Sequence, residues 1–149
     1  MITGFNHSGF VVKDLDKMVA FYRDVLGLKV MMEADRSDPE TNLHLGIPNA
    51  KRMLVFVGKE AGQHQLELVL YLYPEDGEEG HTTPNALGAT HVAFNVEDMQ
   101  RMYEEMKERG LNFVTPPIVR DTPFGKSAIC FAQDPEGNWL EFLERLPED

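Results

Sequence analysis

The sequence predicts an α+β fold in which one structural unit occurs twice. The segments that begin at His7 and His91 carry Phe, Val, Asp and Met at the same offsets from the histidine. In each segment a strand-like run precedes a helix-like run, and about three further strand-like runs follow. At 149 residues the chain is long enough to form one domain without disulfides. We therefore expect a single domain over residues 1–149, with module 1 at about 1–73, a linker at 74–88 and module 2 at about 89–149.

The two helices are predicted to begin at Asp14 and Asp98, directly after the first strand of each module. An aspartate at this position accepts hydrogen bonds from the free amides of the first helical turn. Apolar residues then recur at helical spacing in both segments. Gly27 and Gly110 follow, as is typical of a helix that ends on a left-handed residue.

The remaining strands are predicted from short apolar or alternating runs. These are LKVMME, RMLVFVG and QLELVLYLY in the first module, and NFVT, SAICFAQ and NWLEFLER in the second. The linker, PEDGEEGHTTPNALG, is rich in Pro, Gly and acidic residues, which favours a surface segment. Residues 115–128 contain three prolines and a glycine, and we expect a mobile loop there.

Composition excludes several classes of partner. The net charge of −11 argues against nucleic acid and anionic membranes, because both bind basic surfaces. No apolar run reaches the roughly 20 residues of a membrane span, and the N-terminal stretch lacks a signal-peptide pattern, so a cytoplasmic location is expected. The single cysteine, Cys130, lies between Ile129 and Phe131, which favours a buried, unreactive thiol.

Glu67 interrupts an otherwise apolar strand. It lies between Leu66 and Leu68 in QLELVL, where ionising a carboxylate is costly unless something compensates the charge. Glu141 stands at the matching place in NWLEFL, near the end of the second module. The same unusual carboxylate therefore occurs twice.

His7 and His91 open the two first strands. Strand alternation places them on the face that carries the small residues Gly9 and Ala93, opposite the bulkier apolar face that suits the helices. If the two sheets face each other, two histidines and two glutamates form a four-ligand metal site. Such ligands suit zinc, iron, nickel, cobalt or manganese and do not select among them. The alternative is that each is an ordinary hydrogen-bonded histidine, surface carboxylate or salt-bridge partner; the matching offsets favour the metal site.

Three segments, HSGFVVKDLDKMVAFYRDVLGL, GATHVAFNVEDM and DPEGNWLEF, resemble the vicinal oxygen chelate superfamily. It includes glyoxalase I, methylmalonyl-CoA epimerase, extradiol dioxygenases and bleomycin or fosfomycin resistance proteins. The resemblance spans nearly the whole chain and implies two tandem βαβββ modules whose curved mixed sheets enclose one divalent metal ion. It implies as ligands His7, Glu67, His91 and Glu141. The metal would bind a small-molecule substrate through two neighbouring oxygens.

The ligand set favours one chemistry within this superfamily. Two histidines with two glutamates are similar to glyoxalase I, whereas the dioxygenases do not use an acid at the position of Glu67. The resemblance thus implies a metal-dependent lyase or isomerase that transfers a proton next to a carbonyl, with Glu67 or Glu141 as the catalytic base. The sequence departs from glyoxalase I after Glu67, where LVLYLYPEDG follows, and from the epimerases at Thr90, which precedes His91. An iron dioxygenase and a metal-free binding or resistance protein remain as alternatives.

Other polar and aromatic residues are weaker candidates for binding the substrate. Cationic side chains that could grip an anionic tail are Arg36, Arg52, Arg120 and Lys126. Tyr71 and Trp139 share strand faces with the two glutamates and could line a pocket. Solvated charge or ordinary packing is the alternative for each of these residues. The resemblance leaves open whether the site forms within one chain or between two exchanged chains, so a homodimer is one outcome.

Overall fold

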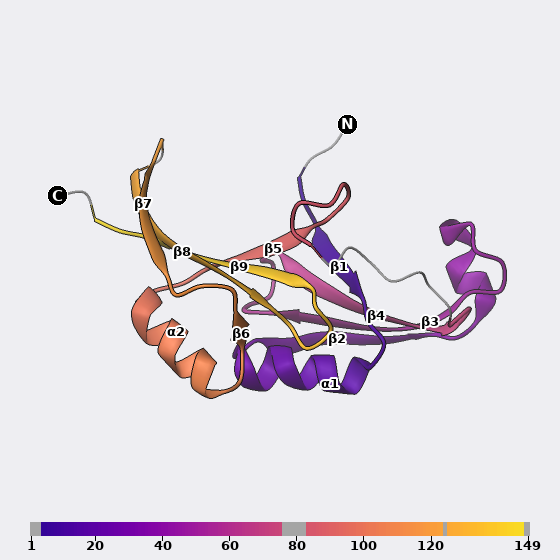
Figure 1. The fold of residues 1–149 in the computed structure, drawn as a ribbon. Coiled ribbons are helices and arrows are strands. Elements are labelled where there is room, and N and C mark those ends of the chain that lie inside the picture. The colour runs from indigo at the N-terminus through magenta and orange to yellow at the C-terminus, as the bar shows by residue number, and fades with distance from the viewer. Residues whose placement is uncertain (1–3, 76–82, 124, 148–149) are drawn as a thin grey trace. The chain divides into compact units, whose positions relative to one another are not determined.

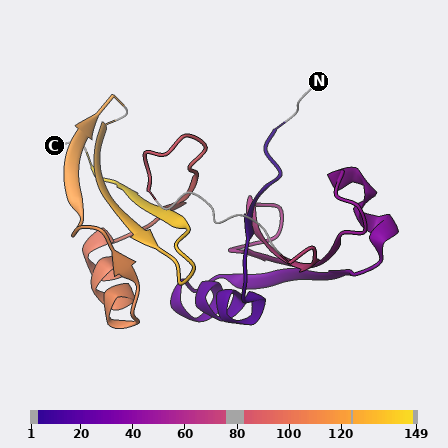
Figure 2. The same cartoon turned by 45° about the vertical axis from the view of Figure 1, so that its right-hand side comes forward.

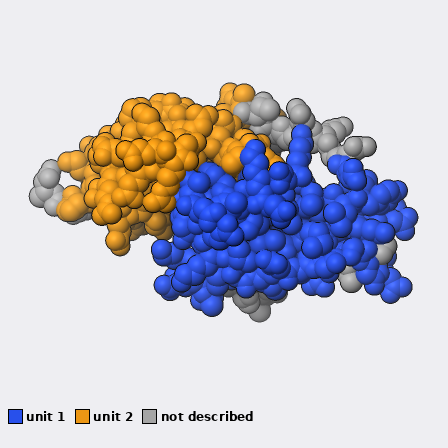
Figure 3. All heavy atoms as spheres, turned by 90° about the horizontal axis from the view of Figure 1, so that it is seen from below, with its two compact units in different colours: residues 1–79 blue, residues 80–149 orange. Residues whose placement is uncertain are grey.

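The computed structural model describes residues 4–75, 83–123 and 125–147. The chain divides into two compact units, unit 1 over residues 1–79 and unit 2 over 80–149 (Figure 3). The division falls within the predicted linker, of which residues 76–82 lie outside the described residues. The α+β class and the repetition of a strand–helix–strand unit are confirmed.

Unit 1 contains one four-stranded sheet and a helical segment (Figure 1). Its elements are β1 (His7–Val11), α1 (Leu15–Ala20), the π-helical turn η1 (Phe21–Val25), β2 (Lys29–Arg36), the 3-10 helix η2 (Pro39–Leu45), β3 (Lys51–Gly58) and β4 (Gln65–Tyr73). The strand order is β1-β4-β3-β2. The first and last strands, β1 and β4, pair in parallel, and the other pairs are antiparallel.

Unit 2 repeats this arrangement. Its elements are β5 (His91–Asn95), α2 (Met99–Glu108), β6 (Asn112–Phe113), β7 (Ile118–Thr122), β8 (Gly125–Gln133) and β9 (Trp139–Arg145). The strand order is β5-β9-β8-β6, and β7 also pairs with β8. The first and last strands, β5 and β9, are again parallel. Unit 2 therefore places two short strands, β6 and β7, along β8 where unit 1 has the long strand β2 (Figure 2).

Both helices begin at the predicted aspartates. Asp14 Oδ1 accepts a hydrogen bond from the Lys17 amide at 3.0 Å, and Asp98 Oδ1 accepts one from the Arg101 amide at 3.2 Å. The first helical segment does not stay α-helical: α1 passes into the π-helical turn η1 before Gly27, which has a φ of 70°. The predicted starts and ends are thus correct, and the sequence pattern did not reveal the π-helical turn.

The core of each unit lies between its helix and one face of its sheet. Leu68 on β4 and Leu140 on β9 are completely buried, as are Met18 and Tyr22 of the first helical segment. Since side chains alternate along a strand, Glu67 and Glu141 point from the opposite face. Each sheet therefore packs one face against its helix and carries its glutamate on the other face, as the predicted alternation requires.

The segment over residues 115–128 differs from the predicted loop. Residues 118–122 form β7, which pairs antiparallel with the start of β8. The two prolines before Ile118 interrupt the strand, and pairing with β8 restores it after them. Among the described residues, no helix is long and apolar enough to span a membrane.

Candidate metal centre

His7 and Glu67 meet on the open face of the unit 1 sheet. In the parallel pairing of β1 with β4, Gly9 lies opposite Glu67, and His7 is two residues before Gly9. His7 Nε2 lies 3.4 Å from Glu67 Oε2, and the glutamate side chain is only 15% exposed. The structure therefore brings together the histidine and glutamate that the sequence predicted for module 1.

His91 and Glu141 form the same pair in unit 2. Here Ala93 lies opposite Glu141 in the parallel pairing of β5 with β9, and His91 is again two residues earlier. His91 Nε2 lies 3.0 Å from Glu141 Oε2, and this glutamate is 12% exposed. The two pairs thus occupy identical register positions, and we call them the unit 1 and unit 2 half-sites.

An aromatic ring completes each half-site. Phe56 on β3 lies opposite Glu67 and packs edge-on against His7, with ring centroids 5.3 Å apart. Phe131 on β8 lies opposite Glu141 and packs in the same way against His91 at 5.5 Å. Neither phenylalanine was predicted as a site residue, although aligning RMLVFVG with SAICFAQ on their single phenylalanines would have found both.

The donor atoms of the half-sites fit a divalent metal. His7 Nδ1 lies 2.7 Å from Asn6 Oδ1. When Nδ1–H donates to this oxygen, the lone pair that binds a metal remains on Nε2, beside the carboxylate. A neutral imidazole nitrogen and a carboxylate oxygen facing each other favour a cation between or next to them.

Each unit supplies two donors and not four. Among the described residues, no cluster of three or more His, Cys, Asp or Glu side chains could hold a metal ion. The structure therefore brings His7 to Glu67 and His91 to Glu141, and a site with all four ligands requires one half-site from each of two units. That assembly stays a prediction.

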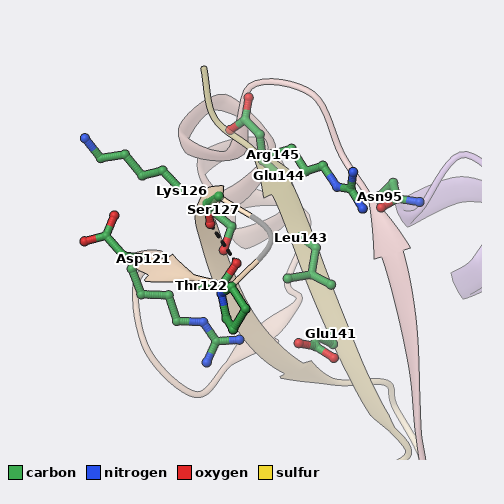
Figure 4. A pocket seen from close by; sticks show the side chains of 12 residues that line it. Asn95, Asp121, Thr122, Lys126, Ser127, Glu141, Leu143, Glu144 and Arg145 are labelled. Carbon is green, nitrogen blue, oxygen red and sulfur yellow. Dashed lines mark hydrogen bonds between the residues drawn. The ribbon is translucent and has the colours of Figure 1, made fainter. Parts of the chain in front are cut away.

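A pocket of about 520 Å³ in unit 2 adjoins the half-site there (Figure 4). Its lining residues are Asn95, Arg120, Asp121, Thr122, Pro123, Gly125, Lys126, Ser127, Glu141, Leu143, Glu144 and Arg145. Two of the cations proposed from sequence, Arg120 and Lys126, therefore line the same pocket as Glu141. Both lie in strands, on β7 and β8, and not in the loop that the sequence suggested.

Arg120, Ser127 and Arg145 form a straight row across the pocket wall. Ser127 on β8 lies directly opposite Arg120 on β7 and Arg145 on β9. Directly opposite residues share a sheet face, so the two guanidinium groups flank one serine. We call this set the unit 2 arginine row; Arg145 lies four residues beyond Glu141 on the same strand face.

Another carboxylate of the pocket wall is already engaged by the backbone. Glu144 accepts hydrogen bonds from the amides of Asp98 at 3.0 Å and Met99 at 2.8 Å, at the start of α2. Its negative charge is therefore held at the positive end of that helix. Lys126 lies directly opposite Asp121 in the pairing of β7 with β8, so a cation and an anion share that face of the two strands.

The two aromatic candidates have different surroundings. Trp139 lies directly opposite His91, and its indole nitrogen is enclosed with no hydrogen-bond partner in the described part of the chain. Tyr71 contacts a different group: the Arg52 guanidinium carbon lies 5.9 Å from the centre of its ring. Trp139 is thus next to the unit 2 half-site, whereas Tyr71 belongs to a separate cluster further along β4.

Two sheets of the same topology, each with a histidine–glutamate pair at the same register, define a duplicated α+β protein with a candidate metal half-site in each unit. The chain belongs to the Glyoxalase/Bleomycin resistance protein/Dioxygenase superfamily, whose family profile matches residues 4–142.

Named relatives agree with this membership. A lactoylglutathione lyase of Haemophilus influenzae is 30% identical over 142 residues, covering 93% of this chain and 90% of the relative. One from Neisseria meningitidis is 30% identical over 146 residues, covering 96% of this chain and 91% of the relative.

Solved structures share the fold at lower sequence identity. A glyoxalase family protein from Bacillus cereus superposes with a TM-score of 0.84 at 21% identity, covering 99% of this chain and 97% of the other. Glyoxalase I of Leishmania major gives a TM-score of 0.65 at 24% identity, covering 93% and 84%. These similarities support the fold of the chain.

Proposed function

We propose that this chain is a divalent-metal-dependent lyase or isomerase that moves a proton next to a carbonyl group of a small molecule. The observation that carries the proposal is the pair of half-sites, each with a histidine and a glutamate at the same strand register. The relatives named lactoylglutathione lyase support the lyase class. His7, Glu67, His91 and Glu141 would hold one metal ion, for which zinc, nickel, cobalt, manganese and iron are suitable.

The metal, when bound, would polarise a substrate carbonyl and lower the cost of removing a proton from the neighbouring carbon. Glu141 is then the first candidate for the base, because its carboxylate lies in the wall of the unit 2 pocket. Its oxygen would take the proton from one carbon and return it to the next. Glu67 is the matching candidate in unit 1, so either glutamate is able to serve as acceptor or donor.

The pocket supplies groups that would orient the substrate. The unit 2 arginine row offers two forked donors for a carboxylate or phosphate at the end of the molecule away from Glu141. Leu143 lies between Glu141 and Arg145 on the same strand face and contributes an apolar surface. This order of groups suits a small molecule with a reactive carbonyl at one end and an acidic group at the other.

Metal content and turnover test the proposal together. We expect freshly purified protein to bind one equivalent of zinc, nickel or cobalt per chain, whether a site forms within one chain or between two exchanged chains. The metal-loaded protein should convert a hemithioacetal of glutathione or epimerise a chiral 2-acyl thioester. Glu67→Gln and Glu141→Gln should each weaken metal binding at least about 100-fold, since loss of even an outer hydrogen-bond partner costs 10–100-fold.

Glu33→Gln is the matched control. Glu33 is an exposed glutamate on β2, away from the half-sites. Its substitution by glutamine removes the same charge and should leave metal affinity unaltered. Normal metal affinity in both Glu67→Gln and Glu141→Gln would refute the four-ligand site. Fully metallated protein inactive on both substrate types would refute the lyase or isomerase assignment, with iron and oxygen uptake pointing to a dioxygenase. Absence of metal after mild purification would favour a binding protein.

A further inference from the structure

Two arginines face each other at the end of the unit 1 sheet. Arg36, the last residue of β2, lies directly opposite Arg52 on β3, and Arg52 lies directly opposite Tyr71 on β4. Tyr71 is four residues beyond Glu67, so strand alternation places this row on the face of the half-site. We call Arg36, Arg52 and Tyr71 the unit 1 arginine row.

Arg52 is held firmly before any ligand arrives. Its side chain is 8% exposed, and its Nε donates to Asn42 Oδ1 at 2.9 Å. Asn42 is completely buried, and its own amide donates to the carbonyls of Arg36 at 2.6 Å and Ala50 at 2.8 Å. The Tyr71 ring supports the guanidinium from the side. Because folding already fixes this side chain, a ligand would not have to order it.

The unit 1 arginine row carries two positive charges. In the described part of the chain, no carboxylate forms a salt bridge with Arg36 or Arg52. Asp35 is adjacent in sequence but points to the other face, where it accepts hydrogen bonds from Ser37. A buried guanidinium opposite a second cation is costly unless an anion joins it.

The terminal nitrogens of Arg52 are reachable from solvent. Among the described side chains, the only enclosed nitrogen or oxygen without a hydrogen bond is the indole nitrogen of Trp139. The Nη atoms of Arg52 have no hydrogen-bond partner among the described residues and are not enclosed, so they retain contact with solvent. Arg36 is exposed beside them. The pair therefore presents N–H donors outward, as recognition of a planar oxyanion requires.

The unit 2 arginine row is the counterpart at the matching register. Tyr71 and Arg145 each lie four residues beyond the glutamate, and Arg52 and Ser127 each lie four residues before the half-site phenylalanine. Both rows thus contain two arginines across three strands. If the Arg52–Asn42 hydrogen bond were purely structural, it would account for the position of Arg52 Nε. It would not account for the second arginine, Arg36, directly opposite.

We propose that Arg36 and Arg52 form an oxyanion site that binds a carboxylate or phosphate group of the substrate and selects for acidic substrates. This inference rests on the proposed function for the identity of the substrate, but the anion site itself belongs to unit 1 and needs no metal. The two arginines lie on β2 and β3, on the sheet face that carries the unit 1 half-site. The favoured substrate class is accordingly a carbonyl compound that carries a carboxylate or phosphate group.

Anion titration of the metal-free full chain tests the site directly. Methyl phosphate and acetate would be titrated at constant ionic strength with chloride, while NMR follows the Nε–H signals of the arginines. We expect a saturable shift of the Arg52 signal with at least one probe, and the tighter probe identifies phosphate or carboxylate as the group. Arg36→Gln and Arg52→Gln should weaken this binding roughly tenfold or more, as expected for loss of a charge-assisted hydrogen bond.

Arg23→Gln is the matched control, because Arg23 already donates to both oxygens of Asp24 at 2.6 and 2.7 Å. It should leave the anion affinity of Arg52 unchanged, and Arg52→Lys should retain charge but bind more weakly. Arg36 is exposed, so Arg36→Gln keeps the test valid even if Arg52→Gln does not fold. Equal shifts at Arg23 and Arg52, or unaltered anion affinity in both glutamine variants, would overturn the oxyanion site.

Turnover separates this inference from the proposed function. With metal-loaded protein, Arg36→Gln should raise KM for an acidic substrate and leave KM for its neutral methyl ester unchanged. If the protein binds the anion saturably but shows no turnover, the proposed function is refuted and the inference of an oxyanion site is supported. Turnover without anion binding at Arg52 refutes the oxyanion site alone.

Discussion

The two half-sites share their strand register but differ in the residues around them. In unit 1 the residue opposite the glutamate is Gly9, and His7 contacts Asn6; in unit 2 the opposite residue is Ala93, and the histidine–glutamate distance is 0.4 Å shorter, 3.0 against 3.4 Å. Unit 2 also has the pocket beside its glutamate. Parallel pairing of the first and last strands is thus the feature that duplication kept. The surroundings are where the two units have specialised.

The helices show the same division between shared and changed features. Both begin at an aspartate, but Asp14 has an extended backbone, whereas Asp98 is left-handed with a φ of 54°. Glu144 compensates by accepting from the amides of Asp98 and Met99. The start of α2 is therefore held by a carboxylate of β9, a strand that also lines the pocket.

The largest expected effect tests whether the cores of the two units are equivalent. Leu66 and Leu140 immediately precede the two glutamates and are 4% and 0% exposed. Leu66→Ala and Leu140→Ala should each lower the free energy of unfolding by about 2–5 kcal/mol, because each leaves a cavity under the sheet. Hydrogen exchange followed separately in residues 4–75 and 83–147 measures both losses. A loss in one unit below about 1 kcal/mol would show that its core is less well packed than burial indicates.

Substituting the residue opposite each glutamate should have an intermediate effect, here on metal affinity. A Cβ at Gly9 would lie 3.3 Å from Glu67 Oε2, so the carboxylate must shift by a few tenths of an ångström. Gly9→Ala should therefore weaken metal binding roughly tenfold, in the range of other perturbations around metal ligands. Ala93→Gly removes a contact without displacing Glu141 and serves as the reciprocal control. Calorimetric titration with zinc measures both, and an unchanged affinity in Gly9→Ala would show that Glu67 tolerates the alanine as Glu141 does.

The smallest effect concerns Cys130, whose counterpart beside the half-site phenylalanine of unit 1 is Val55. Burial raises the pKa of the Cys130 thiol from 9.0 to about 11. The thiol should react with alkylating reagents at pH 8 about 100-fold more slowly than in unfolded protein, since two pKa units lower the thiolate fraction by that factor. Labelling kinetics with and without urea measure this ratio, and rapid labelling of the folded chain would contradict it.

The same shift sets the direction of a pH dependence. The folded pKa lies above the unfolded value, so the thiol contributes stability below about pH 9, and this contribution is lost as the pH rises towards 11. Cys130→Val should remove this dependence while changing stability by less than about 1.5 kcal/mol, as for other volume-conserving substitutions. Thermal melts between these pH values compare the two proteins.

Local pattern was sufficient to predict both α-helices, every strand except β7, and the sheet face on which each glutamate lies. Alternation around Glu67 and Glu141, together with the repeat, identified both histidine–glutamate pairs before any contact was known. The β7 strand was missed because prolines precede it and its pairing with β8 is not encoded in its own residues.

The arginine rows were missed for a related reason. Arg36 and Arg52 are distant in sequence, and only the registers of β2 with β3 and β3 with β4 make them neighbours of each other and of Tyr71. Both arginines were candidates from the sequence, but nothing in the sequence places them side by side. Register is a tertiary property, since one residue of slippage would send every side chain to the other face.

The parallel pairing of β1 with β4, and of β5 with β9, also has a consequence for synthesis of the chain. Each histidine is among the first residues of its unit to leave the ribosome, and its glutamate belongs to the last strand. The unit 1 half-site is therefore completed only after β4 has emerged, and that of unit 2 only after β9 has emerged. Metal binding by either pair would then stabilise only those chains in which the last strand of the unit has already paired with the first.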